Sequence, residues 1–191
     1  MKQLFEKCKK IISEKSDAVI AIDGMCASGK TTLASNLAEQ FGAQIIHMDD
    51  FFLTPEMRTE QRLSQAGGNI HYERFVDEVV SGVLSGNEFS YRVFSCKTGE
   101  FAQTKSVQPS TPIIVEGSYA LHPLIPDIYD LKIFLEITLE TQLERILCRN
   151  GKEALEVFKS KWIPLENLYF DTFDIKNKCD FIIKQNTDQG F

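Results

Sequence analysis

The chain has 191 residues, of which 43% are hydrophobic and 25% are charged. This length fits a single domain with a sizeable core, and the composition is ordinary for a globular protein. The formal net charge of −6 argues against a general nucleic-acid-binding protein, because phosphate contacts need a basic face. A local basic pocket for one nucleotide remains compatible with that charge.

Cysteines and histidines are scattered along the chain. The five cysteines are odd in number and include no C-x-x-C pair. This usage is typical of reduced thiols and gives little support to a disulfide framework or a zinc site. The N-terminus lacks the apolar core of a signal peptide, and no run approaches the length of a membrane span. The sequence therefore predicts a soluble, cytoplasmic protein with neither a membrane nor a nucleic-acid partner.

The first predicted element is an amphipathic helix over residues 2–15, where apolar side chains recur at helical spacing. We expect this helix to pack on the domain; a helix lying on a membrane surface is the alternative. The short apolar run 18–22 predicts a buried parallel strand. Residues 31–41 predict a helix that ends at Gly42, and residues 44–47 predict a second strand.

The middle of the chain interrupts this alternation. Residues 53–70 are polar, contain paired glycines and predict a long mobile connection. A helix is predicted over 72–84. It is followed by two strands, 89–94 and 101–107, which form a hairpin.

The last part of the chain returns to alternating elements. Buried strands are predicted at 112–115, 131–135 and 181–184, and helices at 138–148 and 152–160. Strands that alternate with helices imply a three-layer α/β domain, with a mainly parallel five-stranded sheet and a small β-hairpin excursion.

The stretch GMCASGKTT, residues 24–32, fits the phosphate-binding pattern G-x-x-x-x-G-K-[ST] between a strand and a helix. Its glycines allow backbone N–H groups to surround a phosphate, and the helix N-terminus adds partial positive charge. Lys30 would reach the β and γ phosphates, and the Thr31 hydroxyl would ligate Mg²⁺. The predicted fold is therefore that of a P-loop NTPase. The predicted nucleotide-binding residues in this loop are Gly24, Ala27, Ser28, Gly29, Lys30, Thr31 and Thr32.

Two further features near nucleotide motifs need an interpretation. The stretch NKCD at 177–180 matches the guanine-reading pattern N-K-x-D, but the apolar run follows it instead of preceding it. We therefore interpret Asp180 as the start of a strand. Cys26 lies inside the glycine loop, where nearby amide groups would lower its pKa and make it redox-sensitive; the alternative is a tolerated occupant of a variable position.

Three more stretches place polar residues at strand ends or on a helix. IIHMDDFF ends the second strand with Asp49 and Asp50, and IIVEGSYAL ends the third with Glu116, a carboxylate suited to Mg²⁺ or its water. LERILCRNG puts Arg145 and Arg149 on one helical face, a spacing suited to a lid that clamps phosphates.

With these motifs, residues 19–183 resemble the uridine kinase and phosphoribulokinase family of P-loop kinases. The resemblance rests on GMCASGKTT, DDFF, GGNIHYERF, VEGSYAL and the R-x-x-x-R spacing. It implies a single kinase domain over 1–191, with an acceptor-side insertion at about 53–110 and a lid at about 145–162. It also implies ATP and Mg²⁺ as cofactors and in-line phosphoryl transfer.

The roles of individual residues follow from the same resemblance. Asp49 would accept the proton of, or orient, an acceptor hydroxyl. Lys30, Arg149 and Mg²⁺ would stabilise the transferring phosphoryl group, and Arg145 would help to bind the nucleotide. Thr31, Glu116 and Asp50 would form the metal site.

The acceptor-reading motifs of uridine kinases are not matched. His71 stands where the family has its ribose-gripping aspartate, within NIHYE where the family has N-F-D-H-P. The resemblance implies a nucleoside acceptor, and the candidates to bind it are Asp49, His71, Tyr91, Arg92, Phe94 and Arg58.

Several alternatives remain open at this point. The acceptor could be another hydroxyl-bearing metabolite, or a nucleoside monophosphate whose phosphate is bound by Arg58, Arg62 and Arg74. A nucleotide-binding regulatory protein without transferase activity is the alternative from a different class. The sequence leaves the oligomeric state open, a homo-oligomer included.

Overall fold

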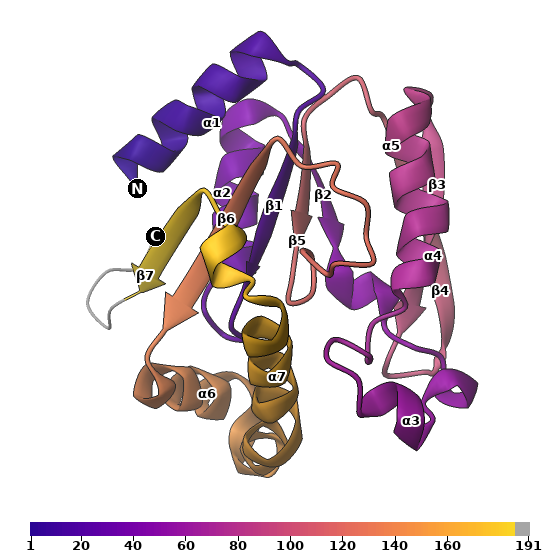
Figure 1. Cartoon of the computed structure of the whole chain (residues 1–191), viewed down its shortest axis with the longest axis vertical. Helices are drawn as coiled ribbons and strands as arrows, with labels where there is room; N and C mark the ends of the chain where they lie inside the picture. Colours follow the sequence, from indigo (N-terminus) through magenta and orange to yellow (C-terminus); the bar gives the residue numbers. More distant parts are fainter. Residues whose placement is uncertain (186–191) are drawn as a thin grey trace.

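The computed structural model describes residues 1–185. At its centre is a sheet of five strands in the order β2-β5-β1-β6-β7, with every neighbouring pair parallel (Figure 1). The strands are β1 (Val19–Gly24), β2 (Gln44–His47), β5 (Ile113–Glu116), β6 (Leu131–Ile137) and β7 (Phe181–Gln185). Together with an antiparallel two-stranded hairpin, this sheet confirms the predicted fold class. Because the carboxyl ends of parallel strands share one edge, the residues that end β1, β2 and β5 meet there.

Helices cover both faces of the sheet. On one face, α1 (Lys2–Glu14) and α2 (Lys30–Phe41) bury Leu4, Cys8, Leu33 and Leu37 against β1, β5 and β6. On the other face, α7 (Ile163–Phe173) contributes aromatic side chains to a second core cluster. Burial of each large apolar side chain contributes about 1.5–3 kcal/mol. The prediction that the first helix packs on the domain is confirmed, and within residues 1–185 every helix is too short or too polar to cross a bilayer.

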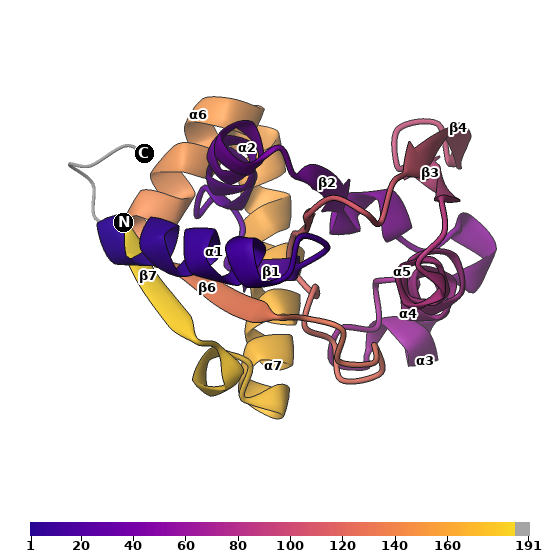
Figure 2. The same cartoon turned by 90° about the horizontal axis from the view of Figure 1, so that it is seen from above.

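A lobe stands at the end of the sheet away from β7 (Figure 2). Its members are α3 (Glu60–Leu63), α4 (Tyr72–Phe75), a π-helical segment (Val76–Val80), α5 (Ser81–Ser85), β3 (Phe89–Ser95) and β4 (Glu100–Val107). The helical segments from α4 to α5 follow one another without a break, as the predicted helix over 72–84 requires.

A column of stacked side chains connects the lobe to α7. The Arg62 guanidinium lies 4.1 Å from the centre of the Tyr72 ring, and that ring stacks on His122 at 4.6 Å. His122 in turn lies parallel to Tyr169 of α7, with ring centres 6.0 Å apart. Burial lowers the pKa of His122 to about 4, so this imidazole is neutral at pH 7.

Two predicted segments differ from the structure. Residues 53–70 are not an unstructured connection, because the Arg62 guanidinium donates to the backbone carbonyls of Gly68 and Ile70 and holds the segment against the lobe. The predicted helix over 152–160 does not stop there. A π-helical segment (Phe158–Trp162) continues from α6 (Leu139–Val157) into α7. Pro164 directly follows this π-helical segment; it has no N–H to donate to the preceding turn, and the Ile163 N–H donates to the Phe158 carbonyl in the wider π-helical pattern.

Strand β1 ends beside a fully buried carboxylate, Asp23. It accepts hydrogen bonds from the backbone N–H groups of Gly24, Tyr119 and Leu121 and from the Tyr169 hydroxyl, at 2.7 to 3.2 Å. Burial raises the pKa of Asp23 from 3.8 to about 6, and these donors oppose the rise. At pH 7 the group is therefore mostly ionised, and it joins the phosphate loop, the segment after β5 and α7.

Replacing this carboxylate should destabilise the protein. In Asp23→Asn an amide N–H would face other donors, so we expect the free energy of unfolding at pH 7 to fall by about 2–4 kcal/mol. Urea unfolding followed by circular dichroism measures this change.

The exposed Asp77→Asn is the matched control and should stay within about 0.5 kcal/mol of the parent. Because the folded pKa of Asp23 lies above its unfolded value, proton uptake favours the folded state between pH 6 and 4. The stability gap between the parent and Asp23→Asn should therefore widen by about 2 kcal/mol from pH 7 to pH 4.5. A gap that stays constant or narrows would contradict this assignment.

Candidate active site

The turn between β1 and α2 curls its backbone N–H groups around a space at the helix N-terminus. Ala27 and Gly29 have positive φ angles of 59° and 94°, a geometry that makes an anion-binding nest. At Gly24, a Cβ atom would lie 2.2 Å from the carbonyl oxygen of Leu135. Only glycine therefore lets β1 end this close to β6.

Lys30 begins α2 and is almost buried, with 8% of its surface exposed. Its ammonium group donates to the carbonyl oxygens of Gly24 and Met25, both at 2.8 Å, and to the Ser118 Oγ atom at 3.3 Å. The loop carbonyls and Ser118 thus hold the Lys30 side chain folded back along the phosphate loop.

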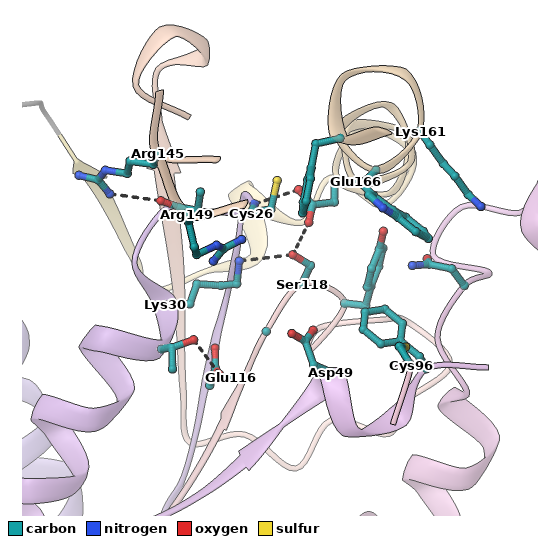
Figure 3. Close-up of a pocket in the computed structure, with 18 of the residues that line it drawn as sticks. Cys26, Lys30, Asp49, Cys96, Glu116, Ser118, Arg145, Arg149, Lys161 and Glu166 are labelled. Carbon is teal, nitrogen blue, oxygen red and sulfur yellow. Dashed lines mark hydrogen bonds between the residues drawn. The ribbon is translucent and has the colours of Figure 1, made fainter. Parts of the chain in front are cut away.

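A carboxylate from α7 also reaches this loop. Glu166 is buried; its Oε1 atom accepts from the Ser118 hydroxyl at 2.7 Å and its Oε2 atom from the backbone N–H of Cys26 at 2.9 Å. Because the Ser118 hydroxyl donates its hydrogen bond to Glu166, its oxygen has a lone pair free to accept from Lys30. Figure 3 shows this chain of contacts.

Two oxygen groups suited to Mg²⁺ lie beside the lysine. The Thr31 hydroxyl donates to the Glu116 Oε1 atom at 3.1 Å, and His47 Nδ1 lies 2.6 Å from the same oxygen. The hydrogen bond with Glu116 raises the pKa of His47, and burial opposes this rise. Mg²⁺ keeps several waters and takes few protein oxygens, so Thr31 and Glu116 fit it.

A cavity of about 730 Å³ opens at this edge of the sheet. Asp49 follows β2, and its carboxylate points into the cavity (Figure 3). Burial by the surrounding walls raises the pKa of Asp49, Lys30 opposes the rise, and Glu116 adds to it. Of the residues predicted for the site, the cavity is lined by Ala27, Gly29, Lys30, Thr31, Thr32, Asp49, Arg58, Glu116, Arg145 and Arg149.

The two predicted lid arginines project from α6. Arg145 donates to the carbonyl oxygen of Ala27 at 3.2 Å, and Arg149 donates to the side chain of Asn150 at 2.8 Å. Gly151 interrupts the helix just beyond them, with a φ of 82° and a ψ of 177°. Figure 3 shows both arginines on the Lys30 side of the cavity.

Asp50 and Tyr91 do not line the cavity, contrary to their predicted roles in metal and acceptor binding. The Asp50 carboxylate accepts from Lys105 at 2.9 Å and from the Tyr91 hydroxyl at 3.2 Å, so it faces the hairpin. Tyr91 is 1% exposed and stacks on Phe51 with ring centres 5.3 Å apart. Both residues pack the lobe.

Three other predicted acceptor residues also lie outside the cavity lining. The His71 ring caps α4 by accepting from the backbone N–H of Arg74. Arg92 pairs with Glu78, and Phe94 is buried within the lobe. These side chains cap a helix, form an ion pair and pack the lobe, so the prediction that they bind the acceptor is replaced by a structural role.

Several cavity residues were not among those predicted for the site. They are Cys26, Phe52, Leu53, Leu63, Asn69, Cys96, Gly117, Ser118, Tyr119, Phe158, Lys161, Trp162 and Glu166. Asn69 and Ser118 lie inside the motifs GGNIHYERF and VEGSYAL, which offered a signal for them. Trp162 and Glu166 lie in and beyond the lid, where helical periodicity alone does not show which side chains face the phosphate loop.

Cys26 lacks the environment of a reactive thiol. Burial and the neighbouring Glu166 carboxylate raise its pKa to about 12, the opposite of the lowering that amide groups would cause. Its side chain packs with Ile146 and Ile163, and the Gln142 amide donates to its backbone carbonyl. Cys26 is therefore a packing residue between the loop and the lid helices.

The Asp180 carboxylate accepts from the backbone N–H of Lys132 at 2.8 Å. It joins the start of β7 to β6, in agreement with its interpretation as a residue that starts a strand. The N-K-x-D match is thus part of a strand connection.

The sheet is parallel, and at its carboxyl edge a glycine loop, a lysine held along that loop and a cavity lined by carboxylates lie together. These features define a kinase of the P-loop class. The chain belongs to the Phosphoribulokinase / Uridine kinase family, whose family model matches residues 19–154. The resemblance inferred from the motifs is thereby confirmed.

The names cytidylate kinase and uridine kinase recur among the proteins that the chain resembles. It is 28% identical to a cytidylate kinase of Thermotoga neapolitana, over 83% of this chain and 81% of that protein. It is 25% identical to a uridine kinase of Chlamydia pneumoniae, over 90% of this chain and 83% of that protein. A solved structure titled as a possible uridine kinase from Bacillus stearothermophilus shares the fold, with a TM-score of 0.66, 18% identity and coverage of 93% and 95%.

Thiol reactivity should follow burial. We expect iodoacetamide to alkylate the exposed Cys148 and Cys96 first, and Cys8 and Cys26 to stay protected in the folded protein. Peptide mass spectrometry after timed labelling measures the order. In concentrated guanidinium chloride all sites should react, and labelling of Cys26 as fast as Cys148 in the native protein would contradict the buried environment.

Proposed function

We propose that the protein transfers the terminal phosphoryl group of ATP to a hydroxyl of a small neutral acceptor, with a nucleoside as the best candidate. The observation that carries this proposal is that Asp49 and Lys30 line one cavity beside the phosphate loop. A base and a phosphate-binding lysine in one space suit in-line transfer.

Each group then has a chemical task. The nest and Lys30 bind the β and γ phosphates, and Arg145 and Arg149 neutralise negative charge on the transferring group. Thr31 and Glu116 would hold Mg²⁺, which shields charge on the phosphates. Asp49 orients the acceptor hydroxyl and takes its proton as the new oxygen–phosphorus bond forms.

The cations around the acceptor side favour a hydroxyl acceptor over a nucleoside monophosphate. The Arg62 guanidinium forms an ion pair with Glu73 and donates hydrogen bonds to the Tyr72 hydroxyl and to two backbone carbonyls. Arg74 is 4% exposed and donates to Glu78 and to the carbonyls of Arg92 and Asp50. Arg58 lines the cavity, but a phosphate dianion bound there would lack the arginine cluster that compensates its lost hydration.

Asp49→Asn tests the proposed base. Without a proton acceptor, turnover should fall by roughly 10²–10⁴-fold, while ATP affinity stays within a few-fold. Steady-state kinetics and calorimetric ATP titration separate the two quantities.

The adjacent Asp50→Asn is the matched control, because it removes the same charge from a side chain outside the cavity. It should keep turnover within about threefold of the parent. A folded Asp49→Asn protein with retained turnover would remove Asp49 from its role.

An acceptor panel tests the substrate class. ADP release from Mg-ATP should depend on uridine or cytidine and should be at least about tenfold less efficient with CMP or UMP, because Arg62 and Arg74 are bound by other protein groups and do not line the cavity. Pantothenate and sugars complete the panel. Stimulation by a monophosphate alone would make the protein a nucleoside monophosphate kinase, and ATP binding without stimulation by any acceptor would support a regulatory protein.

A further inference from the structure

The cavity has two ends of different character. In Figure 3, Lys30, Arg145 and Arg149 lie on one side of Asp49, whereas Cys96 and Lys161 lie on the other. We call the second part the acceptor end. It includes Trp162, whose ring centre lies 4.6 Å from the Lys161 ammonium, and Asn69, whose backbone carbonyl accepts from the N–H of Leu53; both residues line the cavity. The Leu53 carbonyl in turn accepts from Arg58, which lies beside Cys96.

Asn69 is a buried polar group in this wall. It is 7% exposed and lies beside Tyr119, where its side chain opposes the larger rise in the pKa of that phenol that burial causes. Contact with one phenol engages only one of the hydrogen-bonding positions of this carboxamide. An amide carries two donors and an acceptor with two lone pairs, so most of its capacity remains for a ligand.

Trp162 supplies a flat apolar face in the same wall. It is the single tryptophan of the chain and is half-buried. The Lys161 ammonium lies 4.6 Å from its ring centre, and Trp162 lines the cavity, so part of its side chain is accessible to a ligand ring. The next residue, Ile163, packs with Cys26 and Ile146, so the backbone at Trp162 is anchored to the phosphate loop.

We propose that Trp162 and Asn69 determine acceptor specificity: the indole stacks on a planar heterocycle, and the carboxamide hydrogen-bonds to its edge. This inference rests on the proposed function, because it assigns the planar ring to the acceptor of the same site. Stacking is tolerant of ring identity, whereas a buried amide left unpaired disfavours acceptors without a polar edge. Together they select a nucleoside over a sugar that carries the same hydroxyl.

The position of Trp162 favours the acceptor ring over the adenine of ATP. The triphosphate occupies the phosphate loop, and the lid arginines lie on that side of Asp49 (Figure 3). A ring bound against Trp162 instead lies beyond Asp49, where the acceptor must bring its hydroxyl.

The single tryptophan makes binding directly observable. Uridine or cytidine added to the native protein without ATP should quench its tryptophan fluorescence in a saturable way, and D-ribose should not. Asn69→Ala keeps the fluorophore and should raise the dissociation constant for the nucleoside by about tenfold. This measurement needs no catalysis, so its outcome is independent of whether phosphoryl transfer occurs.

Kinetics of variants provide the second measurement. Trp162→Ala should raise the KM for the nucleoside by about tenfold or more, with the KM for ATP unchanged. Trp162→Phe, which keeps an aromatic face, should restore most of the loss. Val157→Ala, at an exposed position of the same lid outside the cavity, is the matched control and should leave both constants unchanged.

Three results would overturn the inference. One is an equal effect of Trp162→Ala on nucleosides and on ribose, and another is a rise in the KM for ATP in place of the nucleoside. The third is unchanged nucleoside affinity in Asn69→Ala. If turnover is found with an aliphatic acceptor and is indifferent to Trp162, the specificity assignment fails while the proposed phosphotransferase stands.

Discussion

The buried carboxylate of Asp23 is the interaction on which the arrangement of the site depends. It receives hydrogen bonds from the start of the phosphate loop, from the segment that follows β5, and from α7. A buried carboxylate that lost these four donors would be strongly destabilising. The hydrogen bonds therefore hold the three segments together at Asp23. Ser118 and Glu166, which contact Lys30 and the loop, lie on two of the segments that Asp23 brings together.

A second constraint is electrostatic. Lys30 stands among carboxylates of different origin, with Glu116 from β5, Asp49 after β2 and Glu166 from α7 lining the same cavity. Burial raises the pKa of Asp49, and repulsion from Glu116 and Glu166 adds to the rise, whereas Lys30 opposes it. A bound triphosphate adds more negative charge, so cations are needed to offset it. Arg145 and Arg149 supply part of that charge from α6, whose helical φ/ψ angles are interrupted at Gly151.

Much of the fold was predictable because it depends on short-range patterns. The apolar run before the glycine loop, the helical periodicity of the first helix and the strand at residues 44–47 each reflect local burial or geometry. The prediction of a mobile connection over 53–70 was wrong because this segment is ordered by Arg62, which donates to the backbone carbonyls of Gly68 and Ile70. The extension from the lid into α7 was missed because its amphipathic pattern is weak, since α7 buries Ile163 in one core cluster and Tyr169 and Phe170 in another.

The sequence by itself determined the phosphate loop, the sheet and the acidic residues at strand ends, because spacing and the alternation of strands with helices specify these directly. Which acidic and aromatic residues face the nucleotide was decided by the tertiary structure. Asp49 and Asp50 are neighbours in the chain, yet one points into the cavity and the other is held by Lys105 and Tyr91. That difference arises from the packing of the hairpin against the turn after β2, a long-range contact that local sequence does not encode.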